Sequence, residues 1–101
     1  MKLIAVMSIE QYAGELRQIF IDHHVPVFSE IPVQGYKSPS TQTERDNWFA
    51  HKPVSVYSHL TFAFTGADMA EELMAAIQKK SRELDPLNPV RAFQLNVENF
   101  L

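Results

Sequence analysis

The chain has 101 residues, 46% of them apolar, and a formal charge of −3 at pH 7, which predicts one small globular domain spanning residues 1–101. Its few basic residues are scattered and no apolar run approaches the roughly 20 residues of a bilayer span, so neither nucleic-acid binding nor membrane insertion is expected. The absence of cysteine excludes disulfides and thiolate sites and favours a reducing compartment, the cytoplasm.

The first part of the chain predicts a strand, a helix and a second strand. Residues 3–7 form an unbroken apolar run of strand length, and residues 8–11 read Ser-Ile-Glu-Gln, a capping box that predicts a helix start with Ser8 as its cap. Apolar residues follow at helical spacing until Pro26, which ends the helix before it. The alternating pattern of residues 25–33 predicts a strand, and its two prolines favour an edge position.

The second part predicts a strand, a helix and a last strand. Residues 54–64 alternate in the clearest strand pattern of the sequence, and a turn at Gly66 precedes a helix with Asp68 as the predicted cap. Residues 85–89 contain two prolines and end that helix. Residues 92–97 alternate again and predict the final strand.

This order predicts an α+β fold of the ferredoxin-like βαββαβ type, with a four-stranded antiparallel sheet and two helices on one of its faces. The other face is then open, and an open face with aromatic residues favours pairing with another subunit. Two registers remain for this face. It carries either the row of Tyr57, His59, Thr61 and Ala63 or the opposite row with Leu60, Phe62 and Phe64.

A long polar loop, Gly35 to Pro53, separates the second and third predicted strands. Loops of this length in small domains are uncommon and usually functional or disordered, so this loop is the predicted working part of the protein. Trp48 and Phe49 interrupt its polar sequence and either fill a subunit interface or anchor a partner protein. The predicted partner-binding residues are Tyr36, Lys37, Arg45, Trp48 and Phe49.

Signals for catalysis and metal binding are sparse. No nucleophile motif or glycine-rich phosphate loop is visible among only three glycines, which weighs against a self-contained enzyme. Of the histidines, His59 in the predicted strand and His51 in the loop are the candidate ligands for a divalent metal, although their spacing matches no ligand motif. A small dimeric α+β barrel enzyme, with Tyr57 and His59 facing a cavity, is a further alternative.

Three stretches resemble the PII-like signal proteins (nitrogen regulatory protein P-II-like). They are the opening Met1-Lys2-Leu3-Ile4-Ala5-Val6, the loop-to-strand passage 47–64 and the ending Val90-Arg91-Ala92-Phe93-Gln94-Leu95-Asn96-Val97-Glu98. The resemblance implies a non-catalytic homotrimer whose loop, the family's T-loop, contacts a membrane transporter or enzyme, with small effectors bound in clefts between subunits. The copper-tolerance (CutA-like) family has the same fold and implies instead a divalent-metal-binding trimer.

The chain departs from the PII-like pattern at residues 81–89, which replace the family's Gly-rich nucleotide loop. The resemblance therefore does not imply ATP binding in the family's usual manner, and the cofactor stays open between an adenine nucleotide, a divalent metal and neither. The candidate effector-binding residues are Arg82, Arg91 and Gly35.

Overall fold

The computed structural model describes residues 1–36 and 57–101. The elements are β1 (Lys2–Ser8), the 3-10 helix η1 (Glu10–Tyr12), α1 (Ala13–Asp22), β2 (Ser29–Pro32), β3 (His59–Thr65), α3 (Ala67–Ser81) and β4 (Arg91–Asn96). Their order confirms the predicted sequence of strands and helices. Residues 54–56 of the predicted third strand lie outside the described residues.

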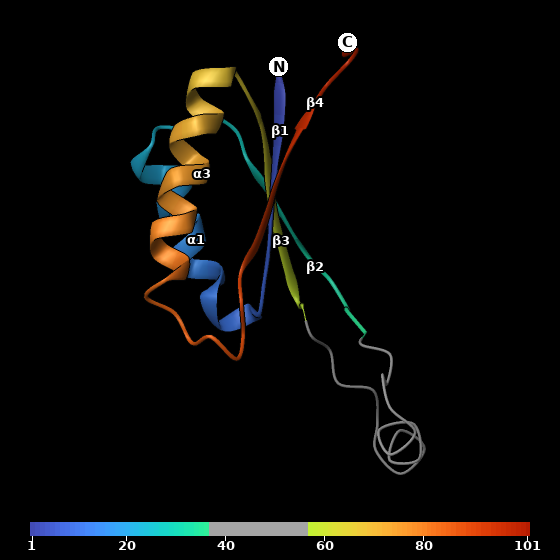
Figure 1. Cartoon of the computed structure of the whole chain (residues 1–101). Coiled ribbons are helices and arrows are strands. Elements are labelled where there is room, and N and C mark those ends of the chain that lie inside the picture. The colour runs from blue at the N-terminus through green and yellow to red at the C-terminus, as the bar shows by residue number, and fades with distance from the viewer. Residues whose placement is uncertain (37–56) are drawn as a thin grey trace.

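The four strands form one antiparallel sheet in the order β2-β3-β1-β4, so β1 and β3 are central and β2 and β4 are the edges. Both helices lie on the same side of this sheet, and no described element covers the other side (Figure 1). This arrangement confirms the ferredoxin-like fold. The edge position of β2 also agrees with its one proline, Pro32, which has no amide donor for a further strand.

The hydrophobic core lies between the sheet and the two helices. From β1, Ile4 and Val6 are fully buried, and they meet Leu16 and Phe20 of α1 and the buried face of α3. The ring of Phe20 also lies against that of Phe28, with 5.2 Å between their centroids. The buried hydrophobic residues are Ile4, Val6, Ala13, Leu16, Phe20, Val25, Ala63, Ala70, Leu73, Ile77 and Val90.

The register of β3 is the second of the two predicted alternatives. Thr61 and Ala63 are buried beneath the helices, whereas 54% of Phe64 is exposed on the open face. The other alternative, in which His59, Thr61 and Ala63 face away from the helices, does not occur. Both rows of this strand contain residues that can be buried, so the alternating pattern fixes the strand but not its orientation.

Both predicted helix caps are wrong. Ser8 is the last residue of β1, and its hydroxyl donates to the carbonyl of Ile9 at 3.0 Å instead of accepting a hydrogen bond from a helix amide. A 3-10 turn then precedes α1. In the second helix Gly66 is the N-cap, so Asp68 lies inside the first turn, where its charge is favoured by the helix dipole.

The second strand is shorter than the predicted 25–33. His24 adopts a left-handed backbone, with φ at 57°, and the chain leaves α1 there. Val25 then packs into the core instead of pairing with a strand, and ladder pairing to β3 is confined to Ser29–Pro32. The helix α3 likewise ends at Ser81, before the predicted stop at residues 85–89.

Candidate functional site

The two ends of the long loop leave the sheet side by side, where β2 ends and β3 begins (Figure 1). The amide of Val33 donates to the carbonyl of Ser58 at 2.9 Å, and the amide of Gly35 donates to the carbonyl of Tyr57 at 3.0 Å. The Ser58 amide continues this network to the carbonyl of Ser8 at the end of β1, at 3.0 Å. The base of the loop is therefore fastened to the sheet by backbone hydrogen bonds.

Gly35 lies at the closest approach of these two segments. A Cβ at this position would lie 3.0 Å from both the backbone nitrogen and the carbonyl oxygen of Tyr57, closer than carbon atoms normally come to backbone. The absence of a side chain thus allows the two ends of the loop to meet. The structure gives Gly35 this role at the loop base, and its predicted role in effector binding stays a prediction.

Most of the predicted partner-binding residues cannot be placed. Tyr36 is described, and 61% of its surface is exposed beside the loop base. The residues that lie outside the described part of the chain are Lys37, Arg45, Trp48, Phe49 and the candidate metal ligand His51.

A charged cluster that the sequence did not predict joins α1 to β2. The guanidinium of Arg17 donates two hydrogen bonds to Glu30, from Nε to Oε1 at 2.7 Å and from Nη2 to Oε2 at 2.9 Å. These hydrogen bonds lower the pKa of the Glu30 carboxyl below its usual value and raise the pKa of Arg17. Glu30 is therefore held as a carboxylate against the helix.

His59 lies next to this pair, with its Nε2 3.5 Å from Oε2 of Glu30 and only 14% of its side chain exposed. At that distance the contact is weak, and among the described residues the buried atoms His59 Nε2 and Thr61 Oγ1 have no hydrogen-bond partner. Residues 1–36 and 57–101 contain no group of three potential metal ligands. Since Arg17 already occupies both oxygens of Glu30, this carboxylate is poorly placed to help His59 hold a metal. The metal site stays a prediction.

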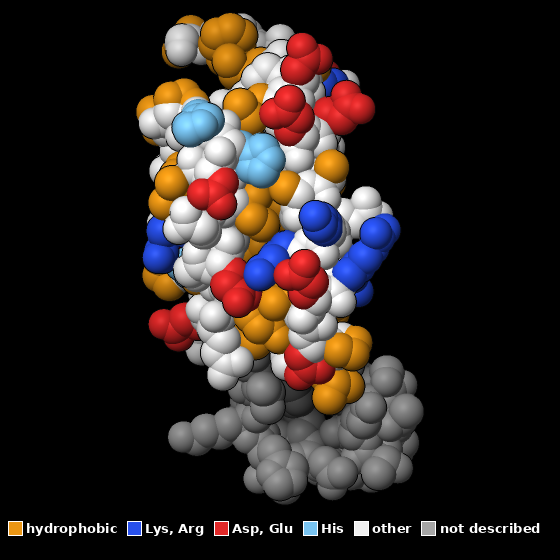
Figure 2. All heavy atoms as spheres, turned by 90° about the vertical axis from the view of Figure 1, so that its left-hand side faces the viewer, with side chains coloured by type: hydrophobic (Ala, Val, Ile, Leu, Met, Phe, Trp, Pro, Cys, Tyr) orange, Lys and Arg blue, Asp and Glu red, His pale blue; other side chains and the backbone are white. Residues whose placement is uncertain are grey.

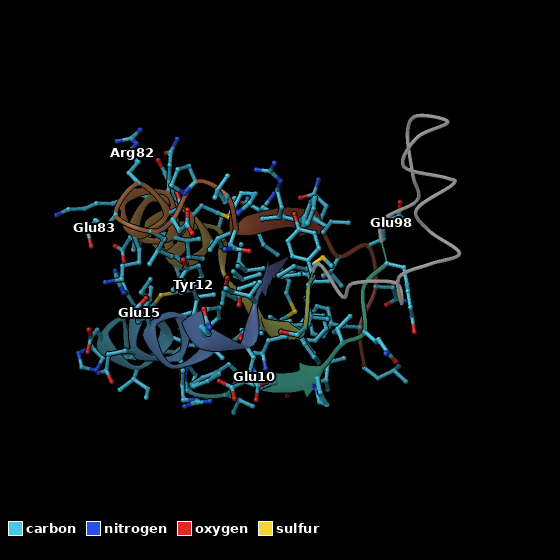
Figure 3. All side chains as sticks on the ribbon, turned by 90° about the horizontal axis from the view of Figure 1, so that it is seen from below. Glu10, Tyr12, Glu15, Arg82, Glu83 and Glu98 are labelled. Carbon is cyan, nitrogen blue, oxygen red and sulfur yellow. The ribbon has the colours of Figure 1, made fainter. Side chains whose placement is uncertain are left out.

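A hollow of about 470 Å³ lies between the second half of α3 and the start of β4. Its lining residues are Met74, Ala75, Ile77, Gln78, Ser81, Val90, Arg91 and Ala92. Arg91 supplies the only formal charge of this lining, and within the described residues it makes no ion pair. Arg82 does not share the hollow. It caps α3, and Figure 3 shows it with Glu83 on the outer side of that helix, away from the sheet.

The segment that replaces the Gly-rich loop is an ordered turn. The carboxylate of Asp85 accepts hydrogen bonds from the amide of Leu87 at 2.9 Å and from the side chain of Asn88 at 3.3 Å. The amide of Asp85 donates to the hydroxyl of Tyr12 at 3.2 Å, and Tyr12 lies between the two helices (Figure 3). This turn is thereby fastened to η1.

All four strands contribute apolar residues to the open face of the sheet, and the register adds only Ser29 and Arg91 as polar residues among the described strands. Phe64, Phe93 and Leu95 expose 54%, 49% and 51% of their surface on it. The ladder places them in rows with residues of β1, because Leu3 pairs with both Phe64 and Leu95. The apolar residues of the face are Leu3, Ala5, Met7, Ile31, Leu60, Phe62, Phe64, Phe93 and Leu95.

The outer surface of the helices, unlike the open face of the sheet, carries many charged side chains. Figure 2 shows acidic and basic side chains intermixed over it, with smaller apolar areas between them. Such a mixed surface is typical of a face in contact with water, whereas a large exposed apolar area marks an interaction site. Within the described residues no helix is long and apolar enough to cross a membrane.

No family model matches the sequence, and no curated protein matches it. Solved structures do match. One is a PII-like signaling protein from Thermus thermophilus, with a TM-score of 0.64 at 14% identity over 95% of this chain and 85% of that one. Another is CPII, a nitrogen regulatory PII-like protein from Thiomonas intermedia bound to ADP, AMP and bicarbonate, with a TM-score of 0.61 at 10% identity over 99% of this chain and 94% of that one. The chain therefore has the fold of PII-like signalling proteins.

Proposed function

We propose that the protein is a non-catalytic PII-like regulator that acts as a homotrimer. The observation that carries the proposal is the fold, which matches PII-like proteins over nearly the whole chain and leaves one face of the sheet apolar and uncovered. Burial of that face between subunits removes a large apolar surface from water and stabilises a domain that is too small to bury it alone.

The effectors to test first are those named for a structural neighbour. CPII is bound to ADP, AMP and bicarbonate, all of them anions. Arg91, at the start of β4 and without an ion pair in the described residues, is the basic residue best placed to meet an anion. Because an Asp85-centred turn stands in place of the Gly-rich loop, a phosphate has no glycine cradle there, and bicarbonate is the simpler fit.

The Gly35–Pro53 loop is the proposed contact with the regulated protein, a membrane transporter or an enzyme. The backbone hydrogen bond between Gly35 and Tyr57 lies at the base of this loop, so we expect an effector bound near that base to act on the loop and leave the sheet unchanged. Trp48 and Phe49 are the proposed anchors, because buried aromatic residues dominate the affinity of many protein interfaces.

Light scattering coupled to size exclusion and titration calorimetry test the proposal together. We expect a mass close to three chains at micromolar concentration and binding of at least one of ADP, AMP and bicarbonate. Arg91→Gln should weaken anion binding. Its matched control is Lys79→Gln, which removes an exposed positive charge from α3 at a residue that is not a candidate for effector binding. A monomer of 11.6 kDa at these concentrations would overturn the trimer and the clefts between its subunits.

A further inference from the structure

The two edges of the sheet differ in how well they are protected from a further strand. In β2, the amide of Val33 donates inward to the carbonyl of Ser58 at 2.9 Å. Because backbone groups alternate in direction along an antiparallel strand, those of Glu30 and Pro32 point outward. Pro32 has no amide hydrogen, and it therefore interrupts the hydrogen bonds of any strand that would pair with this edge. Proline is a common device by which natural proteins close a sheet edge.

The edge of β4 has no such protection. The amide of Val97 donates to the carbonyl of Met1 at 3.1 Å, in line with the register between β1 and β4. By the same alternation, the backbone amides and carbonyls of Ala92, Gln94 and Asn96 point away from β1. None of these three residues is proline or charged, and in the described part of the chain no strand lies beyond β4. An unpaired edge of this kind is a template for another extended strand.

The β4 edge is complementary to itself. When two copies are set antiparallel with their Gln94 residues opposite each other, Ala92 of each copy lies opposite Asn96 of the other, and every outward amide meets an outward carbonyl. On the open face the same register sets Phe93 of each copy opposite Leu95 of the other, and such cross-strand apolar pairs stabilise a sheet. On the helix side the two Gln94 side chains can each donate and accept a hydrogen bond.

We propose that β4 pairs antiparallel with β4 of a second copy of the chain and extends the sheet across a two-fold axis. The β2 edge is the poorer partner for β4, because Pro32 cannot donate its share of the hydrogen bonds. An axis perpendicular to the sheet leaves the helices of both copies on one side and both open faces on the other. The pairing therefore leaves the open face available and goes beyond the proposed trimer. A three-fold and a two-fold contact together give an assembly of six chains.

Sedimentation velocity over a concentration series tests the pairing. Since β4 has only 6 residues, we expect trimers at low micromolar concentration and assemblies of six chains in the high micromolar range. Gln94 pairs with the buried Ile4 and so lies on the helix side of the sheet, where a substitution does not alter the open face. Gln94→Pro removes the central outward amide, keeps the hydrogen bonds to β1 and should leave trimers at every concentration. Gln94→Ala is the matched control, which keeps the amide and should still form assemblies of six chains.

A second variant and a second measurement guard against unfolding of β4 by proline. Gln94→Lys leaves the backbone intact but sets two positive charges opposite each other at the two-fold axis, so it should also leave trimers. Amide hydrogen exchange followed by NMR reports the edge directly. We expect the amides of Ala92, Gln94 and Asn96 to become protected as the protein concentration rises, whereas exchange of the outward amide of Glu30 stays unchanged.

The pattern of masses separates this pairing from the proposed trimer. Dimers that Gln94→Pro converts into monomers would support the β4 pairing and overturn the trimer. Trimers at every concentration, with rapid exchange at Gln94, would overturn the β4 pairing and leave the trimer standing. Assemblies of six chains that persist in both Gln94→Pro and Gln94→Lys would place the second contact elsewhere and overturn the pairing as well. A monomer throughout would overturn both contacts.

Discussion

The two faces of the sheet differ in the size and the exposure of their apolar side chains, and the alternating sequence pattern does not show this difference. The face under the helices has small or branched residues at its centre, such as Val6, Thr61 and Ala63, and these side chains are buried. The open face carries the larger rings of Phe64 and Phe93, which stay half exposed. The bulkiest apolar groups of the sheet thus lie on the face that no described element covers, and this is the face through which the proposed trimer would assemble.

The sharpest contrast between the faces is expected in stability. Phe20→Ala leaves a cavity in the helix-covered core and should lower the free energy of unfolding by about 3–5 kcal/mol. Phe64→Ala removes a ring that is 54% exposed in one chain and should cost much less at concentrations where the protein is monomeric. Urea unfolding followed by circular dichroism measures both. Equal losses at low concentration would mean that the open face is part of the folding core of one chain.

For assembly, the larger effect is expected from a substitution on the open face of the sheet. Phe93→Glu places a charge in the middle of the apolar face and should convert the proposed trimer into monomers, because burying an unpaired carboxylate between subunits is strongly unfavourable. Sedimentation velocity measures the mass, and Lys79→Glu on the outer helix surface is the matched control. A trimer that persists in Phe93→Glu would place the subunit contact away from the open face.

A smaller effect on stability is expected from the pair of Arg17 and Glu30, which lies on the helix-covered side of the sheet, and this effect should depend on pH. Because Arg17 lowers the pKa of Glu30 in the folded chain, the pair adds stability above the usual carboxyl value of 4.5 and loses it as the pH falls through the lower folded pKa. Glu30→Gln should therefore be less stable than the natural chain at pH 7, and the difference should shrink toward pH 3. Thermal melts across this range test it. A stability difference between Glu30→Gln and the natural chain that stays constant with pH would show that the charge of the Glu30 carboxylate does not contribute to stability.

The smallest effect is expected for metal binding at His59. Because both oxygens of Glu30 are engaged by Arg17, we expect His59→Ala to leave calorimetric binding of zinc, copper and nickel unchanged. Loss of a stoichiometric site in this variant would favour the divalent-metal trimer. The matched control is His23→Ala, at the end of α1, where the ring lies against its own helix carbonyl.

The order of elements follows from the sequence because it rests on local signals, the apolar periods and the turn residues. The orientation of β3 does not, since both of its rows are compatible with burial and only the packing of the helices decides between them. The contacts between Arg17 and Glu30 and between Tyr12 and Asp85 join residues 13 and 73 positions apart, and no local pattern marks such pairs. Ser8 is a different case, because here a local pattern is present but misleading. The capping-box motif predicts a helix cap at Ser8, whereas this residue pairs with His59 as part of β1.

The meeting of Gly35 and Tyr57 also bears on how this protein can evolve. The hydrogen bond between them closes the long connection at its base, so the sheet does not depend on the number of residues in between. The entropy of closing a flexible loop rises by only about 0.6 kcal/mol for each doubling of its length. We therefore expect insertions and deletions between these two residues to be tolerated far better than a side chain at position 35, where even a methyl group meets the opposite backbone.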